Sequence, residues 1–163
     1  LSDSDFKQAL NSLEPGQTVD AFSIEGDFAW GDSQKHRVLC AGGIGITAFI
    51  PMLKQHQHDH NSINATLFYS FKNDSFLFED TLASITALHP NFSVELLPNK
   101  RITAELIMSR VTDFRKVPYL LSGPSAFVDQ LSTDLIALGV SDGNITGDWF
   151  TGKNGWDTTA VSP

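Results

Sequence analysis

Residues 38–53 read Val-Leu-Cys-Ala-Gly-Gly-Ile-Gly-Ile-Thr-Ala-Phe-Ile-Pro-Met-Leu. The short apolar run that opens this stretch is typical of a central strand in a parallel sheet. The glycines that follow, Gly42, Gly43 and Gly45, predict a tight turn with no Cβ in the way of a ligand, and a helix is expected to begin directly after them. The N–H groups at the start of that helix would point back at the turn and attract an anion, most often a phosphate.

Two other interpretations of this turn stay open. It could join a strand to a helix without binding a ligand. It could also belong to a dehydrogenase-type dinucleotide fold, because Gly43, Gly45 and Ala48 fit the pattern G-x-G-x-x-A. That fold places an acidic residue at the end of its second strand to hold a ribose hydroxyl. Here the second expected strand, residues 65–70, is followed by Lys72, which weakens the dehydrogenase interpretation at its most specific position.

Composition limits the classes of protein to consider. The chain has 163 residues, of which 41% are hydrophobic and 18% charged, as in a globular domain with a small appendage. Its net charge of −8 argues against nucleic acid and anionic membranes as partners. No apolar run reaches the roughly 18 residues that span a bilayer, and no signal peptide opens the chain. The single cysteine, Cys40, fits a reducing compartment, so we expect a cytoplasmic location or the cytoplasmic side of a membrane-bound parent protein.

From residue 36 onward, predicted strands and helices alternate. Strands are expected near residues 37–41, 65–70, 92–97, 118–122 and 144–149, and helices near residues 46–56, 77–88, 103–110 and 124–138. This alternation predicts an α/β fold of three layers, with a parallel five-stranded sheet covered by helices on both faces. Ligands of such sheets bind at the carboxyl ends of the strands, near the switch in strand order. The segments expected at that edge are residues 42–47, 70–72, 122–125 and 148–152.

The first part of the chain differs from the rest. Residues 5–13 predict a short amphipathic helix, which Pro15 and Gly16 end, and residues 18–22 and 24–28 predict two short strands. Two strands and one short helix cannot bury a core by themselves. We therefore divide the chain into residues 1–33, the end of another domain, and residues 34–163, the α/β domain.

Five segments in a fixed order carry a family resemblance. They are AGGIGITAF from Ala41, LFYSFKNDSFLFEDTL from Leu67, KRITAELI from Lys100, YLLSGPSAFV from Tyr119 and LGVSDGNITGDWFTG from Leu138. Together they resemble the pyridine-nucleotide-binding half of the ferredoxin–NADP⁺ reductase family, in particular its bacterial flavin-dependent and ferric-reductase-like members. Residues 6–30 resemble the last helix and strands of the family's flavin-binding barrel, so residues 1–33 would be a remnant of that barrel. The family's flavin motif, Arg-x-Tyr-Ser, is absent from this chain.

The resemblance implies three groups of site residues. The pyrophosphate of NAD(P)H would be held by Gly42, Gly43, Gly45, Ile46 and Thr47. The adenosine ribose would lie beside Ser70 and Lys72. The nicotinamide would lie above Ser122, Gly123 and Pro124, and it would meet the flavin at a wall formed by Asp148, Trp149 and Phe150.

Within these groups, Ser122, Asp148 and Phe150 are the candidate catalytic residues. Lys72 could pair with a 2′-phosphate, so we favour NADPH slightly over NADH. Two positions depart from the family's common pattern, since Ala48 stands where many members have proline and Ser122 where many have cysteine.

The implied function is that of an NAD(P)H-binding domain in a flavin-dependent oxidoreductase. Hydride would pass from NAD(P)H to FAD, and electrons would pass on to an iron–sulfur protein, ferric iron or a haem. The partners would be the missing FAD-binding domain or subunit and the electron acceptor, and this chain alone would be inactive. The alternatives are a nucleotide-binding subunit that acts with a separate flavoprotein, and a flavin-free Rossmann-type dehydrogenase or nucleotide sensor.

Other conspicuous residues are expected to be structural. His56 and His60 could share a helix face and bind a metal, but a solvated helix end explains them better, so we predict no metal site. Ser122 lacks the Gly-x-Ser-x-Gly surroundings of a hydrolase nucleophile. Phe76 and Phe78 are expected in the core.

Overall fold

The computed structural model describes residues 5–20, 28–31, 35–72 and 76–150, and the following statements concern those residues. The strands are β1 (Arg37–Gly42), β2 (Ala65–Phe71), β3 (Phe92–Pro98), β4 (Tyr119–Pro124) and β5 (Ile145–Phe150). The α-helices are α1 (Asp5–Asn11), α2 (Ile46–His58), α3 (Glu79–Leu88), α4 (Ala104–Arg110) and α5 (Ser125–Ala137). Two 3₁₀ turns, η1 (Gly43–Gly45) and η2 (Asp142–Asn144), precede α2 and β5. The strands and helices predicted after residue 36 are confirmed, to within two residues at every end.

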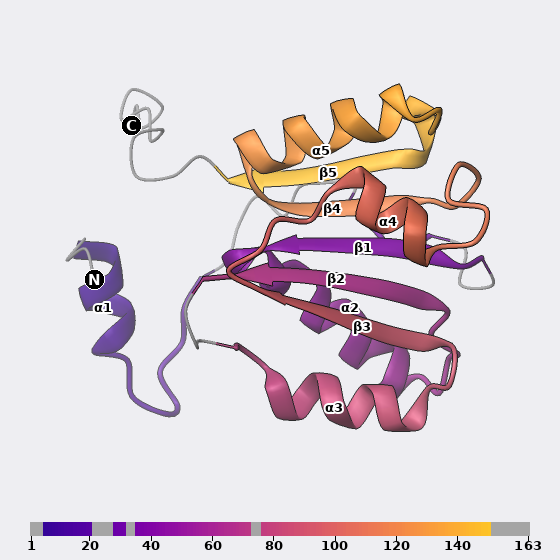
Figure 1. Cartoon of the computed structure of the whole chain (residues 1–163). Coiled ribbons are helices and arrows are strands. Elements are labelled where there is room, and N and C mark those ends of the chain that lie inside the picture. Colours follow the sequence, from indigo (N-terminus) through magenta and orange to yellow (C-terminus); the bar gives the residue numbers. More distant parts are fainter. Residues whose placement is uncertain (1–4, 21–27, 32–34, 73–75, 151–163) are drawn as a thin grey trace.

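The five strands form one parallel sheet in the order β3-β2-β1-β4-β5 (Figure 1). The chain builds outward from β1 to β3 and then returns to place β4 on the other side of β1. The strand order therefore reverses between β1 and β4, and this reversal is the place where sheets of this kind bind ligands.

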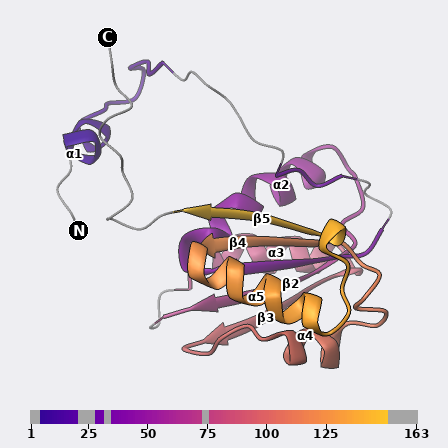
Figure 2. The same ribbon diagram turned by 90° about the horizontal axis from the view of Figure 1, so that it is seen from above.

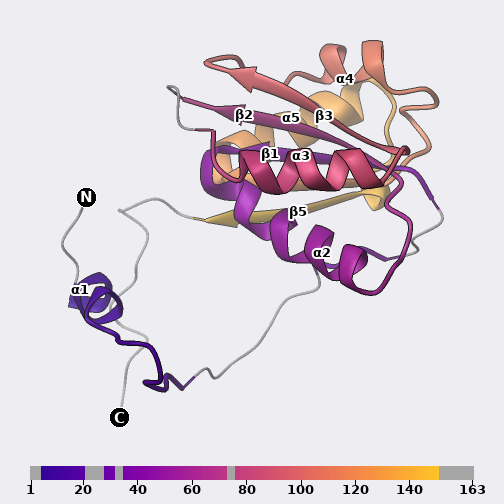
Figure 3. The same cartoon turned by 90° about the horizontal axis from the view of Figure 1, so that it is seen from below.

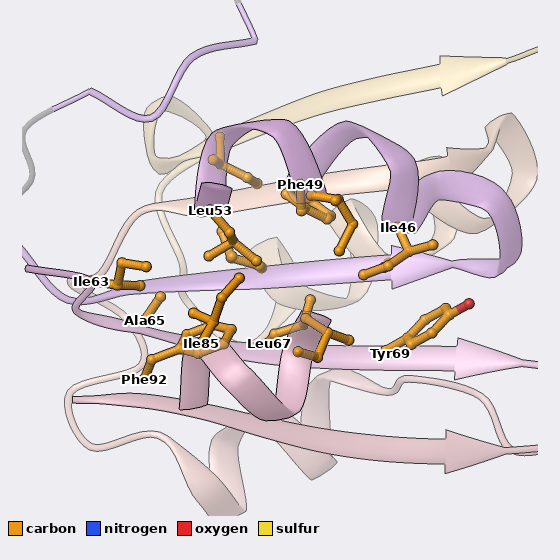
Figure 4. Close-up of a cluster of buried hydrophobic side chains, with 14 of the residues drawn as sticks. Ile46, Phe49, Leu53, Ile63, Ala65, Leu67, Tyr69, Ile85 and Phe92 are labelled. Carbon is orange, nitrogen blue, oxygen red and sulfur yellow. The ribbon is translucent and has the colours of Figure 1, made fainter. Parts of the chain in front are cut away.

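Helices cover both faces of the sheet, as the alternating sequence predicted. Helices α2 and α3 lie on one face, and α4 and α5 lie on the other (Figures 2 and 3). Alternate side chains of β1 belong to the cores on opposite faces of the sheet. Leu39 and Ala41 pack with α2 and α3, whereas Val38 and Cys40 pack with α4 and α5. Figure 4 shows the core on the α2 and α3 side. Burial on both faces explains why β1 is apolar throughout.

The N-terminal segment matches its prediction in part. Helix α1 forms but ends at Asn11, and residues 18–20, expected to begin a strand, are not in one. Most of the predicted strand at residues 24–28 lies outside the described residues. Phe28 and Trp30, which the division at residue 33 assigns to the preceding segment, pack against the core of the α/β domain. Helix α1 lies outside the three layers (Figure 1).

Two predictions about side chains are wrong. Phe78 is 39% exposed and precedes α3 with a φ of 63°, whereas Phe76 does pack against the core. His56 is half-buried, with its ring 4.5 Å from that of Trp30, so it is not a solvated residue at the end of α2. His60 is exposed. Within the described segments, no three metal-binding side chains gather, and no helix has the length and apolar character needed to span a membrane.

Candidate functional site

A groove of about 950 Å³ lies at the carboxyl edge of the sheet, over the reversal in strand order. Its volume lies in the range of about 300–1,000 Å³ that is usual for small-molecule sites. Its walls come from the ends of β1, β2, β4 and β5 and from the first half of α5. The lining residues are Gly42, Gly43, Ile44, Tyr69, Ser70, Phe71, Lys72, Leu77, Arg101, Ile102, Pro124, Ala126, Phe127, Gln130, Leu131, Asp134 and Phe150.

The glycine turn forms one wall of this groove. Gly43 has a φ of +57°, a conformation that other residues rarely adopt, and a Cβ at this position would meet no atom within 4 Å. The turn leads directly into α2. The N-cap residue of this helix is Gly45, so no side chain caps the free N–H groups of its first turn. The backbone N–H of Ile46 already donates to the carbonyl of Gly43. A phosphate would therefore meet the earlier N–H groups of the turn, beside the open space at Gly43.

Gly45 packs directly against β4. A Cβ on Gly45 would lie 2.1 Å from the carbonyl oxygen of Ser122 and 2.8 Å from the nitrogen of Gly123, both in the backbone of β4. The space that Gly45 leaves is therefore filled by β4, so this glycine permits the turn to pack on the sheet and does not make room in the groove. This is the close helix–strand packing that glycine allows in nucleotide-binding turns.

A second pair of glycines accommodates the ring of Phe127. A Cβ on Gly42 would lie 3.0 Å from this ring, and a Cβ on Gly123 would lie 2.8 Å from it. The ring therefore sits over the ends of β1 and β4, and Phe127 lines the groove. Sequence reasoning missed Phe127, although two glycines at the ends of adjacent strands are the signal of a bulky neighbour.

Basic residues lie at another side of the groove. Lys72 and Arg101 both line it and are exposed, in a chain whose net charge is −8. The Ser70 hydroxyl between them in the fold donates to the carbonyl of Lys100 over 2.6 Å, which ties the end of β2 to the segment after β3. Arg101 was not predicted as a site residue, although it belongs to the quoted segment KRITAELI. Its proximity to Lys72 depends on the pairing of β2 with β3, which sequence spacing does not reveal.

The predicted catalytic residues meet at the ends of β4 and β5. Ser122 pairs with Asp148 in the sheet, and its hydroxyl donates to the Asp148 carboxylate over 3.2 Å. Ser122 is only 1% exposed, and neither of the two lines the groove, whereas Phe150 does. Trp149 is 59% exposed. The structure thus brings Ser122 and Asp148 together beside the groove and places Phe150 in its wall.

Some of the predicted nucleotide-binding residues line the groove and others do not. Gly42, Gly43, Ser70, Lys72 and Pro124 line the groove. Gly45, Ile46, Thr47 and Gly123 do not. The side chain of Ile46 is fully buried in the core, and the Thr47 hydroxyl donates to the carbonyl of Ile44 over 2.7 Å. Any contact of Ile46 or Gly45 with a ligand would therefore come from the backbone.

No protein-family model and no curated protein matches the chain, but solved structures do. The CS-b5R domains of human Ncb5or, in the NAD⁺ form, are 24% identical, with a TM-score of 0.70 over 87% of this chain and 45% of that one. The flavohem-like FAD/NAD-binding domain of nitric oxide dioxygenase from Vibrio cholerae O1 biovar El Tor is 22% identical, with a TM-score of 0.66 over 78% of this chain and 56% of that one. Ferredoxin-NADP⁺ reductase from Plasmodium falciparum, with 2′P-AMP, is 18% identical, with a TM-score of 0.58 over 77% and 57%.

The chain thus spans about half the length of these proteins. The matches agree with the family resemblance of the five sequence segments and with the all-parallel sheet of the structure. The chain has the α/β fold of the NAD-binding domains of ferredoxin–NADP⁺ reductase-like proteins.

Proposed function

We propose that this chain binds NAD(P)H as the nucleotide half of a flavin-dependent oxidoreductase. The complete enzyme would pass hydride from NAD(P)H to FAD and electrons on to an iron–sulfur, ferric or haem acceptor. The observation that carries the proposal is the groove at the reversal in strand order, which has the open turn at Gly43 in one wall and the cations Lys72 and Arg101 in another. The fold shared with reductases supports it.

The residues present fit a dinucleotide. The turn at Gly43 offers backbone N–H groups and the positive end of a helix to the pyrophosphate. Lys72 and Arg101 offer positive charge to the adenosine end, where a 2′-phosphate would form charge-assisted hydrogen bonds. The apolar side chains of Ile44, Phe127 and Phe150 line other parts of the same groove, as in most small-molecule sites.

In the proposed reaction, the protein mainly supplies position. Bound NAD(P)H provides the hydride, and transfer requires that its ring be held close to the flavin. Pro124 and Phe150, at the ends of β4 and β5, would form the wall against which the nicotinamide rests. The Ser122 hydroxyl donates to Asp148, which fixes both side chains next to that wall.

The flavin would come from a separate domain or subunit that meets this edge of the sheet. The chain spans about half of the proteins that share its fold, one of which is an FAD/NAD-binding domain. We therefore propose an FAD-binding domain or subunit as the partner, and residues 1–33 as the remnant of such a domain.

A pair of substitutions at Gly43 tests the proposal. Asn and Asp both tolerate a positive φ better than other residues with a side chain, and the space at Gly43 is open, so Gly43→Asn and Gly43→Asp should both fold. Gly43→Asp would put a negative charge beside the pyrophosphate, whereas Gly43→Asn adds a side chain of equal size without charge. We expect calorimetry to show NADP⁺ or NAD⁺ binding to the parent, weaker binding to Gly43→Asn, and binding to Gly43→Asp that is weaker again by at least about tenfold.

Equal affinities for the parent and both variants would mean that the phosphates do not bind at this turn. If the parent binds neither dinucleotide at millimolar concentration, the proposed function is wrong.

A further inference from the structure

The core contains two fully buried tyrosines whose hydroxyls have different surroundings. The Tyr119 hydroxyl, on the α4 and α5 side, donates to the carbonyl of Phe114 over 2.6 Å. The Tyr69 hydroxyl, on the α2 and α3 side, has no hydrogen-bond partner in the part of the chain that the structure describes. Buried polar groups in native proteins are almost always paired, because an unpaired one is costly. The hydroxyl of Tyr69 therefore needs an explanation that packing does not give.

Tyr69 lies next to the glycine turn. It pairs with Ala41 in the sheet, one residue before β1 ends at Gly42, and its side chain lines the groove together with Gly43 and Ile44. Figure 4 shows the ring of Tyr69 extending toward the carboxyl ends of the strands, with the oxygen leading. The hydroxyl thus lies at the end of the sheet where the groove opens.

Leu77 is a neighbour of this hydroxyl in the groove. Leu77, just before α3, is 42% exposed and lines the same groove. Burial raises the pKa of Tyr69, and the Leu77 backbone, which lies near the hydroxyl without forming a hydrogen bond of normal geometry, lowers it by less. The phenol therefore stays protonated at neutral pH. Among the residues that the structure describes, the hydroxyl proton has no acceptor.

We propose that the Tyr69 hydroxyl belongs to the nucleotide site and donates to a phosphate oxygen of the AMP half of the bound dinucleotide. The inference rests on the proposed function. Tyr69 stands between the two parts of the groove that the AMP half would touch, the turn at Gly43 that follows β1 and the pair Ser70 and Lys72 at the end of its own strand. The unpaired hydroxyl thus destabilises the free protein, and a hydrogen bond to the ligand removes that destabilisation.

Tyr69→Phe tests this inference, and Tyr119→Phe is the matched control. Tyr69→Phe removes only the oxygen, so the free chain should keep its melting temperature or gain a little, while its affinity for NADP⁺ falls by about tenfold or more. Affinity for ADP, which contains the AMP half without nicotinamide, should fall by the same factor. Tyr119→Phe removes the hydrogen bond to the Phe114 carbonyl. It should therefore lower the melting temperature and leave the affinities for NADP⁺ and ADP unchanged.

The inference is overturned if Tyr69→Phe binds NADP⁺ and ADP as the parent does. It is also overturned if the substitution lowers the melting temperature as much as Tyr119→Phe does, since the hydroxyl would then have a partner in the free protein. A parent chain that binds neither NADP⁺, NAD⁺ nor ADP would contradict the proposed function itself.

Discussion

Gly43 and Gly45 stand two residues apart in one turn, yet their Cα atoms face different surroundings. Gly43 has a positive φ, and a Cβ on it would point into open space. A Cβ on Gly45 would clash with the backbone of Ser122. We therefore expect Gly45→Ala to cost about 3 kcal/mol or more of folding free energy, because β4 cannot move away from its own sheet. Gly43→Ala should cost about 1–2 kcal/mol, the strain of a left-handed residue. Urea unfolding of the two variants would measure the difference, and equal costs would contradict the packing role of Gly45.

Lys72 and Arg101 carry the prediction about nucleotide choice. If they hold a 2′-phosphate, the parent should bind NADPH more tightly than NADH, since a charge-assisted contact adds about 1.5–3 kcal/mol, or roughly ten- to a hundredfold. Lys72→Glu and Arg101→Glu should each reduce or reverse that preference in calorimetric titrations. Lys100→Glu is the control, because Lys100 precedes Arg101 but its side chain does not line the groove. If all three variants change the two affinities alike, the effect is one of net charge.

At the scale of the element, helix α4 begins where the groove ends. The Thr103 hydroxyl accepts the backbone N–H of Leu106 over 3.2 Å and so caps the first turn of α4, directly after Arg101 and Ile102. Thr103→Ala should therefore cost about 1 kcal/mol of stability, measured by urea unfolding. Thr86→Ala serves as the control, because the Thr86 hydroxyl donates to the carbonyl of Leu82 within α3 and caps no free N–H group. Equal losses for both variants would mean that the cap contributes nothing of its own.

Strands and helices could be predicted from the sequence because their signals are local. The apolar run of β1, the Thr103 cap and the position of Pro124 before α5 each act within a few residues. The groove's other residues could not be found in this way. Arg101 reaches the same groove as Lys72 because β3 pairs with β2, and Phe127 fits against Gly42 and Gly123 because β1 pairs with β4. Phe78 was misassigned because an aromatic side chain gives no local sign that a turn with positive φ will expose it.

At the scale of the whole molecule, Trp30 joins the segment before the sheet to the α/β domain. Its ring lies 4.5 Å from the ring of His56 on α2 and 4.7 Å from the guanidinium of Arg37 at the start of β1. Phe28 contacts Phe49 on the same helix, with ring centroids 5.7 Å apart. Residues 28–30 are therefore anchored to α2 through two aromatic contacts.

This anchor makes stability depend on pH. Burial, then the positive charge of Arg37, holds the pKa of His56 below its ordinary value of 6.5, with Asp59 opposing and His89 adding to the effect. The folded chain thus binds this proton more weakly than the unfolded chain does, so the stabilisation is complete above about pH 6.5 and is lost as the pH falls below it. His56→Gln should flatten the fall in melting temperature from pH 8 to pH 5, as measured by circular dichroism. Equal slopes for the parent and His56→Gln would contradict the assignment.

The proposed division of the chain also decides whether it can hold a flavin. The chain forms the groove proposed to bind the nucleotide, and the sequence lacks the Arg-x-Tyr-Ser motif that the family uses for its flavin. We expect the purified chain to be colourless, with no flavin absorbance and no stoichiometric FAD after gel filtration. The reason is that the residues that bind the flavin ring would have to come from a partner domain. The same chain should still bind NADP⁺ or NAD⁺ in calorimetry, since the groove is formed by its own residues.

Supplying a flavin-loaded partner domain should then restore the oxidation of NAD(P)H by a ferric acceptor, and Gly43→Asp should abolish that restored activity. A tightly held FAD in the isolated chain would show instead that these residues form a flavin site of their own.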